Sequence, residues 1–408
     1  MEKIYEKSVK LHRRLRGKIR VRSKISIKER EMLSLIYTPG VAGPCIEIER
    51  RPLSVFDLTS KWNNVAVVTD GSRVLGLGNI GAEASIPVME GKALLFSELA
   101  GINAFPICLR TQEEKEIVNI VVEISPIFGG INLEDIESPK CFYIEERLRK
   151  RLTIPVFHDD QHGTAVVTFA ALINACRYVG KTLEDLRVVI NGAGAAGIAI
   201  AHLLLQGGVR DIILCDRAGI LYSGRRENMN KYKIMIAEKT NRSNLKGSLE
   251  DALIGADVFI GVSGPRLLKP EMIRLMDREP IIFALANPVP EITPEEAYEG
   301  GAKIVATGRS DYPNQVNNLL GFPGIFRGAL DVRATEINDE MKLAASYAIA
   351  ESVSRRDLER GVIIPEPLDR EVVVNVAERV AEAAVRSGVA RTELRKGDIR
   401  ERLRRLLS

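Results

Sequence analysis

Cysteine is scarce in this chain and is not arranged for metal binding. The 408 residues include five cysteines, Cys45, Cys108, Cys141, Cys176 and Cys215, and no two of them form a Cys-x-x-Cys pair. A disulfide framework or a thiolate zinc site would need closely spaced or paired cysteines. We therefore expect reduced thiols with structural roles.

Long hydrophobic runs are also missing. No stretch approaches the roughly 18 consecutive apolar residues that a membrane span requires. The chain begins Met1-Glu2-Lys3, without the basic and then apolar pattern of a signal peptide. The sequence predicts a cytoplasmic protein with no membrane partner.

Charge of one sign is not in large excess. The 58 basic and 54 acidic residues give a net charge of +4, which is too small to require a polyanionic partner. The segment from Lys7 to Lys24 is rich in cations and contains no acid, so it could bind phosphates. It lacks the interleaved aromatic residues on which bases stack. We predict no nucleic-acid partner and a solvated segment, able to pair with an acidic surface of a second subunit.

The chain has enough apolar sequence for two domains, since 408 residues exceed what one core usually organises. Hydrophobic residues make up 45% and charged residues 27%, as in soluble globular proteins. In the first part, strand-like Asn64–Asp70 and Ala104–Leu109 alternate with helix-like segments, including Gly91–Leu99. This alternation predicts an α/β domain over residues 1–160.

A second α/β unit is expected over residues 161–385. Its strand candidates are separated by helical or proline-marked segments, which predicts a parallel sheet covered on both faces; they are Arg187–Ile190, Asp211–Asp216, Ala256–Ser263, Ile281–Asn287 and Ala302–Thr307. Amphipathic helices are expected at Arg370–Ser387 and Asp398–Leu407. Residues 386–408 form a C-terminal helical segment in this division.

A glycine-rich turn follows the first strand of the second unit and precedes a helix at Ile198–Gln206. It contains Gly192, Ala193, Gly194, Ala195, Ala196 and Gly197. Gly192 allows the tight turn, Gly194 lets the backbone approach a pyrophosphate, and Gly197 permits close packing of helix on strand. The phosphate would lie at the positive end of the helix. This context predicts a Rossmann-type, doubly wound dinucleotide-binding domain.

The acid expected on the adenosine ribose is Asp216, at the end of the next strand. A carboxylate there accepts hydrogen bonds from the ribose and repels a 2′-phosphate, which favours NAD over NADP. Arg217 follows it and could instead pair with a 2′-phosphate, so NADP stays open.

Carboxylates gather in two loops of the first unit, Glu134-Asp135 and Asp159-Asp160. Clusters with only oxygen donors suit Mg²⁺ or Mn²⁺. The same pairs could equally be helix N-termini. His158 and His162 have the spacing of a zinc pair, but the other ligands of such a site are missing.

These residues lie in motifs that resemble the malic enzymes over nearly the whole chain, most closely their small bacterial and archaeal type. The motifs are Tyr37–Ala42, Asp70–Gly81, Pro87–Ala93, the two acidic loops, Ala286-Asn287-Pro288 and Asn317-Asn318. The resemblance implies an N-terminal α/β substrate and metal domain before the Rossmann-type domain, with C-terminal helices. It implies oxidative decarboxylation of (S)-malate to pyruvate, dependent on NAD(P) and a divalent metal, decarboxylation of oxaloacetate, and a homodimer.

The resemblance also implies roles for single residues. Glu134, Asp135 and Asp160 would ligate the metal, with Asp159 beside them. Lys92 would be the base, with its pKa lowered by burial and the nearby metal ion, and Tyr37 the acid that protonates C3. Arg73 matches an arginine that binds the substrate carboxylate in the larger malic enzymes. Asn287 would approach the nicotinamide or the substrate, and Asn318 would hydrogen-bond the substrate.

Two other interpretations stay open at this point. The chain could be another metal-assisted dehydrogenase or a malolactic-type relative acting on a different 2-hydroxy acid. It could also be an inactive nucleotide-binding regulator, although the residues expected to carry the chemistry are all present.

Overall fold

The first sheet has four parallel strands, which matches the α/β domain expected there. The computed structural model describes residues 2–27, 29–74, 76–395 and 397–407, so Leu75 of the Asp70–Gly81 motif lies outside the described residues. The strand order is β2-β1-β3-β4, with bounds β1 Asn64–Thr69, β2 Asn103–Cys108, β3 Gly130–Leu133 and β4 Val156–His158. Helices α6 (Glu114–Ile124) and α7 (Lys140–Arg151) pack on one face of this sheet, and α5 (Gly81–Ala100) packs on the other.

Helix α5 begins ten residues before the Gly91 start that the sequence predicts. Pro87 and Gly91 are poor helix formers that lie inside the helix. In a prediction from sequence they indicate a helix end or start, so the first half of α5 is missed. The helix still forms because one side of it, including Met89, Lys92, Ala93 and Phe96, is buried against the body of the protein. Tertiary packing overrides local propensity here.

The second sheet has six strands in the order β10-β9-β8-β5-β6-β7. All neighbours are parallel except the short edge strand β7. Numbered along the chain from β5 and read from the β7 edge, the order is 3-2-1-4-5-6, the Rossmann order. The strands are β5 Arg187–Asn191, β6 Asp211–Asp216, β7 Gly219–Ile220, β8 Val258–Gly261, β9 Ile281–Ala284 and β10 Ile304–Thr307. The predicted Rossmann-type fold is confirmed.

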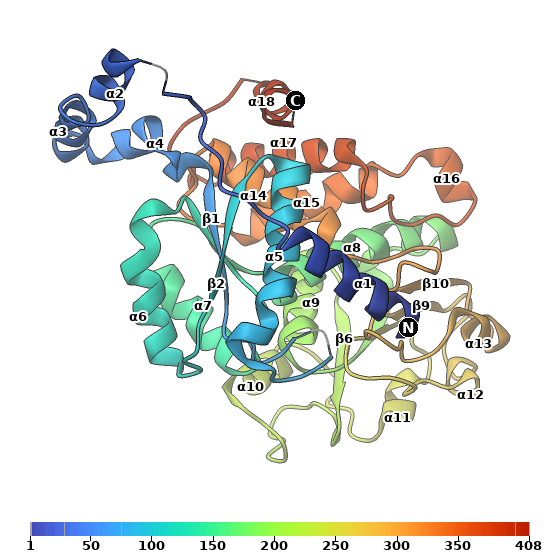
Figure 1. Ribbon diagram of the computed structural model, residues 1–408. Coiled ribbons are helices and arrows are strands. Elements are labelled where there is room, and N and C mark those ends of the chain that lie inside the picture. Colours follow the sequence, from blue (N-terminus) through green and yellow to red (C-terminus); the bar gives the residue numbers. More distant parts are fainter. Residues whose placement is uncertain (1, 28, 75, 396, 408) are drawn as a thin grey trace.

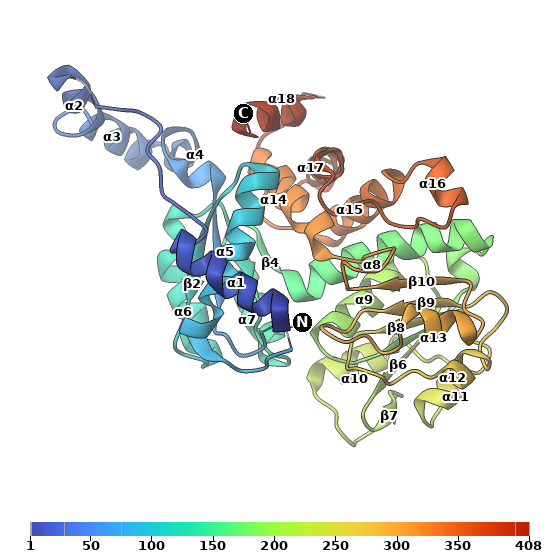
Figure 2. The same cartoon turned by 45° about the vertical axis from the view of Figure 1, so that its right-hand side comes forward.

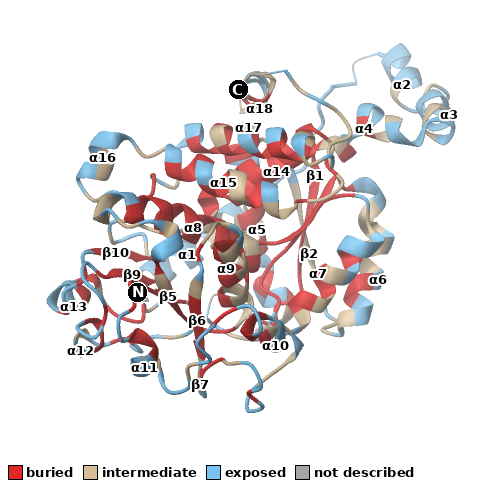
Figure 3. Ribbon diagram, turned by 180° about the vertical axis from the view of Figure 1, so that it is seen from behind, coloured by how far each residue is buried: buried red, intermediate tan, exposed pale blue. Residues whose placement is uncertain are grey.

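Helices cover both faces of the second sheet. On one face lie α8 (Asp159–Val179), α9 (Ala195–Gln206) and α15 (Asp339–Glu351), within the largest apolar core. On the other lie α11 (Leu249–Leu253), α12 (Pro270–Ile273) and α13 (Pro294–Glu299), around a separate core. Buried residues run through both sheets in Figure 3. No helix within the described residues is both long and apolar enough to span a membrane.

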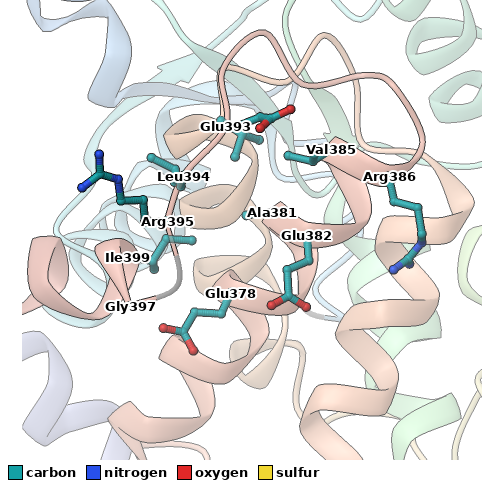
Figure 4. Close-up of a pocket in the computed structure, with 11 residues that line it drawn as sticks. Glu378, Ala381, Glu382, Val385, Arg386, Glu393, Leu394, Arg395, Gly397 and Ile399 are labelled. Carbon is teal, nitrogen blue, oxygen red and sulfur yellow. The ribbon is translucent and has the colours of Figure 1, made fainter.

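The last helices return to the first sheet. Helices α14 (Phe322–Asp331), α17 (Arg370–Arg386) and α18 (Asp398–Leu407) all contact α5, while α16 (Arg355–Glu359) and α10 (Lys231–Ala237) lie on the second unit. Arg327 of α14 is fully buried, and its guanidinium lies 2.6 Å from Asp331 Oδ1. Where the segment before α18 crosses α17, a surface pocket of about 390 Å³ is lined by Glu378, Glu382, Leu394 and Arg395 (Figure 4).

The N-terminal residues are the least packed part of the chain. Helix α1 (Glu2–Leu15) lies against the body, and an extended segment leads from it to α2 (Arg30–Ile36) and α3 (Ala42–Arg50). Neither α2 nor α3 has a buried residue, and both project from the molecule in Figures 1 and 2. The short η1 (Pro52–Ser54), α4 (Val55–Leu58) and η2 (Ser60–Asn63) connect them to β1.

Candidate active site

Three carboxylates meet at the carboxyl edge of the first sheet. Glu134 and Asp135 follow β3, and Asp160 lies in the first turn of α8, directly after β4. One oxygen of each lies within 4.8 Å of the others. The Asp135 N–H donates to Asp160 Oδ2 at 2.8 Å, which ties the two loops together. Neighbouring parallel strands thus bring together the residues that the sequence predicts as metal ligands.

The electrostatics of this cluster favour a cation. Burial raises the pKa of Glu134 to about 7, and Asp160 adds to the rise. Burial also raises the pKa of Asp160 to about 6, helped by the negative charge of Asp159. Keeping these carboxylates ionised side by side is costly unless positive charge compensates them. An all-oxygen set in such surroundings fits a hard divalent ion such as Mg²⁺ or Mn²⁺.

Lys92 is buried beside this cluster. Its Nζ lies 2.5 Å from Asp159 Oδ2 and 3.1 Å from Glu134 Oε1, and 4.0 Å from the centre of the Phe322 ring. Burial lowers the pKa of Lys92, but Asp159 and Glu134 outweigh it, and the pKa is raised overall. The carboxylates thus stabilise the ammonium, and the predicted lowering of the pKa depends on the positive charge of a metal ion.

Asp159 connects Lys92 to Asn318. The Asn318 amide donates to Asp159 Oδ2 at 2.5 Å, the same oxygen that pairs with Lys92. The other oxygen, Oδ1, has no hydrogen-bond partner among the described residues. A Cβ at Gly163 would lie 1.9 Å from Oδ1, so only glycine fits there. The sequence predicts Asp159 merely as a neighbour of the ligands, whereas the structure makes it the residue that bonds both Lys92 and Asn318.

His158 and His162 belong to a different buried cluster, around Glu145. His162 Nε2 lies 2.9 Å from a Glu145 oxygen, and the His158 backbone N–H donates to the other oxygen at 3.1 Å. Burial lowers the pKa of His158 to about 4. The two histidines therefore pack around Glu145 beneath the site.

The glycine-rich turn has the geometry that dinucleotide binding requires. Gly192 has φ +125°, a backbone conformation that favours glycine. A Cβ at Gly197 would lie 1.7 Å from the Gly192 carbonyl oxygen, whereas one at Gly194 would meet nothing within 4 Å. Helix α9 starts at Ala195, and its N-terminus carries no side-chain cap from the described residues. Its free N–H groups and the open space at Gly194 fit a pyrophosphate.

A cavity of about 1010 Å³ extends along the carboxyl ends of β5, β6 and β8. It is lined by residues of both units, among them Arg73, Asn191, Asp216, Arg217, Ser263 and Arg266. The Arg73 N–H donates to the Asp135 carbonyl at 3.0 Å, so Arg73 connects the carboxylate cluster to this cavity. The loop after β9 also meets the first unit, because a Cβ at Gly76 would lie 3.0 Å from Asn287 O.

Comparisons with known proteins agree with this architecture. A family model described as the malic enzyme NAD binding domain matches residues 161–385, and one described as the malic enzyme N-terminal domain matches residues 16–116. A bifunctional malic/malolactic enzyme of Bacillus subtilis is 55% identical over 401 residues, covering 98% of each chain. An NAD-dependent malic enzyme of Geobacillus stearothermophilus is 57% identical, covering 92% of this chain and 78% of the relative. The crystal structure of malic enzyme from Pyrococcus horikoshii has a TM-score of 0.94 and 50% identity, covering 99% of this chain and 96% of that chain.

This chain belongs to the malic enzyme family. The resemblance seen in its sequence motifs is thereby confirmed, and so is its assignment as an enzyme of the NAD(P)-dependent malic enzyme type.

One residue expected in the site of this malic enzyme lies elsewhere. Tyr37 follows α2 on the projecting part of the chain and is 67% exposed. The structure brings together Lys92, Asp159, Asn318 and the three carboxylates but does not bring Tyr37 to them. The motif that contains Tyr37 gives no signal of this, because it says nothing about where the preceding helices pack.

The Asp216 carboxylate, which the sequence predicts to bind the adenosine ribose, accepts hydrogen bonds from four groups of its own chain. Oδ1 accepts from Arg225 at 2.6 Å and from the Ala218 N–H at 2.9 Å. Oδ2 accepts from Lys233 at 2.6 Å and from Asn228 at 2.9 Å. Burial would raise the pKa of Asp216, but the hydrogen bonds from Lys233 and Arg225 lower it overall. A carboxylate has about four acceptor positions, so this malic enzyme fills all of them with its own donors.

Proposed function

We propose that this malic enzyme oxidises and decarboxylates (S)-malate, releasing pyruvate and carbon dioxide while NAD or NADP takes up a hydride. The observation that carries the proposal is the position of Arg73. Its backbone N–H bonds to Asp135 of the carboxylate cluster, and its side chain lines the dinucleotide cavity. A small dicarboxylate held there would lie between the predicted metal ligands and the cofactor.

Arg73, Asn318 and Asn287 would bind and orient malate. The Arg73 guanidinium offers a planar fork of donors that matches a carboxylate. Asn318 already donates to Asp159 beside Lys92, so a small turn of its amide would bring it onto the substrate. Asn287 follows β9 close to Gly76 of the first unit and is exposed, which leaves its amide available to the substrate or the nicotinamide.

Lys92 would remove the proton of the C2 hydroxyl as the hydride leaves C2. Its neighbours Asp159 and Glu134 stabilise the ammonium form, so the free amine needs compensating positive charge at the carboxylates. Glu134, Asp135 and Asp160 would hold a Mg²⁺ or Mn²⁺ ion, which supplies that charge and stabilises the negative charge that develops on the C2 oxygen. With Lys92 neutral, its Nζ can accept the hydroxyl proton.

Loss of carbon dioxide from the resulting oxaloacetate leaves enolpyruvate, which must gain a proton at C3. Tyr37 is the proposed acid for this step; because it projects away from Lys92 of its own chain, it would have to come from a second copy of the chain. Because this half of the reaction needs no hydride transfer, the protein is also expected to decarboxylate added oxaloacetate.

A malolactic activity is a second candidate, because the Bacillus subtilis relative is named a bifunctional malic/malolactic enzyme. In that reaction the reduced cofactor would return its hydride to pyruvate before release, and lactate would be the product. The same residues would serve both reactions, so product analysis has to separate them.

For the cofactor, we propose that both NAD and NADP are accepted. Two cations, Arg225 and Lys233, offset the charge of Asp216, and Arg217 and Arg266 line the same cavity. A 2′-phosphate would therefore meet net positive charge. An Asp216 with free oxygens would instead repel it and favour NAD.

The proposal is tested by following reduced nicotinamide by absorbance with (S)-malate and Mn²⁺, with NAD and NADP in parallel and with EDTA as control. Metal-dependent reduction with an equal amount of pyruvate supports malic enzyme activity. Lactate without net reduction supports the malolactic reaction. Reduction that yields oxaloacetate alone contradicts both.

A further inference from the structure

A buried carboxylate that the proposed mechanism does not use lies beside the dinucleotide cavity. Glu291, in the segment between β9 and α13, is fully buried. Its Oε1 accepts from the Ser263 N–H at 3.2 Å, and its Oε2 accepts from the Ala286 N–H at 3.1 Å. Ser263 follows β8 and Ala286 follows β9. One side chain thus joins the carboxyl ends of two neighbouring parallel strands.

The backbone around Glu291 is shaped to receive its carboxyl group. A Cβ at Gly261, the last residue of β8, would lie 2.4 Å from the Glu291 Cδ atom, so only glycine fits there. The Glu291 carbonyl accepts from the Leu268 N–H at 3.1 Å. The Pro290 carbonyl accepts from the Arg266 N–H, also at 3.1 Å. The loops after β8 and β9 are therefore tied together by both the side chain and the backbone of this segment.

No cation within the described part of the chain offsets the charge of Glu291. Burial raises the pKa of Glu291 to about 7, and hydrogen bonds from backbone N–H groups, including those of the two loops, lower it only in part. None of the charged side chains on the segments packed against Glu291 shifts this pKa; they are Arg266, Lys269, Arg309 and Asp311. A buried carboxylate without a cation costs stability. Such costly groups are typical of functional sites.

Both loops that Glu291 joins lie at the dinucleotide cavity. Ser263 lines this cavity, and its hydroxyl accepts from the Asn191 amide at 3.2 Å. Asn191 ends β5 and immediately precedes the glycine-rich turn. Ala286 immediately precedes Asn287, the proposed contact to the nicotinamide. A shift of either loop would therefore displace groups that are expected to contact the cofactor.

We propose that Glu291 is a positioning residue for the cofactor: its carboxylate holds the loops after β8 and β9 in the arrangement that receives the dinucleotide. Only the ionised carboxylate can accept from both loops with both oxygens. Once protonated, one oxygen carries a hydroxyl donor that faces a backbone N–H, so one loop is released. This inference rests on the proposed use of NAD or NADP and not on the malate reaction.

The pH dependence of cofactor binding tests this role in the wild-type enzyme. Binding of NADH is followed by the fluorescence of its nicotinamide, in the absence of malate. Because the pKa of Glu291 is raised to about 7, its ionised fraction falls about 10-fold between about pH 8 and about pH 6. The affinity for NADH should fall by about the same factor, since only the ionised form is competent to bind.

Glu291→Gln mimics the protonated form at equal size. It should bind NADH about 10-fold more weakly than wild type at about pH 8 and equally at about pH 6. The carboxylates of the metal cluster are present in both proteins, so convergence of the two curves isolates Glu291. Glu295→Gln, at an exposed carboxylate of α13, is the matched control and should follow wild type at both pH values.

Urea unfolding separates a positioning role from a merely structural one. The urea midpoint of Glu291→Gln at about pH 8 should stay close to that of wild type, because the lost hydrogen bond is offset by the lost cost of burying a charge. A structural role would instead lower the midpoint and weaken NADH binding equally at both pH values. That result would overturn the inference, and so would wild-type affinity in Glu291→Gln at about pH 8.

The two proposals fail in different ways. Wild-type enzyme that binds NADH with the expected pH profile but does not turn over malate would contradict the proposed function and support the role of Glu291. Wild-type enzyme that turns over malate while its NADH affinity does not change with pH would overturn the role of Glu291 alone.

Discussion

The Lys92 ammonium and the Asp159 carboxylate form a buried ion pair, with Nζ and Oδ2 2.5 Å apart and side chains 8% and 0% exposed. Asp159 does not belong to the group of three carboxylates that could hold a metal. Because an unpaired buried charge costs several kcal/mol, each partner fixes the other in place. Asp159 is therefore a positioning residue for the base, distinct in role from its neighbour Asp160.

Replacing Asp159 by Asn should lower kcat by about 100-fold, with a smaller change in KM for malate. It should also change the pH profile, because Asp159 contributes the largest charge effect that raises the pKa of Lys92. Without that charge the pKa of Lys92 falls. The limb of kcat that rises with pH should then move to lower pH.

The control for this variant is Glu137→Gln, which removes a carboxylate that is 52% exposed just after the Glu134-Asp135 loop. Its kcat and pH profile should match wild type. An Asp159→Asn enzyme with reduced kcat but an unmoved profile would mean that Asp159 acts on the fold and not on Lys92.

Removing the Asp160 carboxylate should weaken metal binding strongly without unfolding the protein. Asp160→Asn keeps an oxygen acceptor for the Asp135 N–H but removes one of three negative ligands, so Mn²⁺ affinity should fall by about 100-fold or more. Calorimetric titration with Mn²⁺ measures the affinity, and far-ultraviolet circular dichroism checks the fold. Asp211→Asn, at a half-exposed carboxylate of β6, should bind Mn²⁺ like wild type. Full affinity in Asp160→Asn would remove it from the ligand set.

The sequence was sufficient for much of the fold because its signals are local. The β6 strand, the glycine turn after β5 and the helix at Asp398–Leu407 lie where the residue pattern indicates. The turn can be recognised because Gly197 approaches the Gly192 carbonyl within one strand-turn-helix unit, and because Gly192 has a positive φ. The start of α5 was missed because burial of its inner side, not propensity, decides it.

The site was predictable only in part, because its decisive contacts join distant segments. Lys92 and Asp159 are 67 positions apart and Asp159 and Asn318 are 159 apart. No local pattern indicates that Asp159, and not Asp160, forms the ion pair with Lys92. Likewise, Arg225 and Lys233 reach Asp216 from a loop and helix beyond the strand that carries the acid, so the motif alone suggests a free carboxylate.

Acid should weaken the fold through Glu145. Burial would raise its pKa, but the neighbouring His162 outweighs this and the pKa falls to about 2 from an ordinary value of 4.5. A lowered folded-state pKa gives stability that is present above pH 4.5 and is lost as the pH falls toward 2. The shift corresponds to about 3 kcal/mol. In urea unfolding, Glu145→Gln should be less stable than wild type at neutral pH, and the difference should shrink between about pH 5 and pH 3. Glu146→Gln, at the partly exposed neighbour, should show little difference at either pH.

The preference between NAD and NADP should depend on the cations that pair with Asp216. In Lys233→Met, Oδ2 loses its 2.6 Å partner and gains a free acceptor position, while Arg225 alone offsets the charge of Asp216. A ribose hydroxyl can then bond to Oδ2, whereas a 2′-phosphate no longer meets the net positive charge that Lys233 supplies. We expect the ratio of kcat/KM with NADP to that with NAD to fall by about 10-fold, a change of about 1.4 kcal/mol. Lys231→Met, two positions away, is the matched control because Lys231 pairs with Glu146, and its ratio should equal that of wild type. A ratio unchanged in Lys233→Met would mean that the 2′ position lies away from Asp216, and Arg266 would then be the next residue to change.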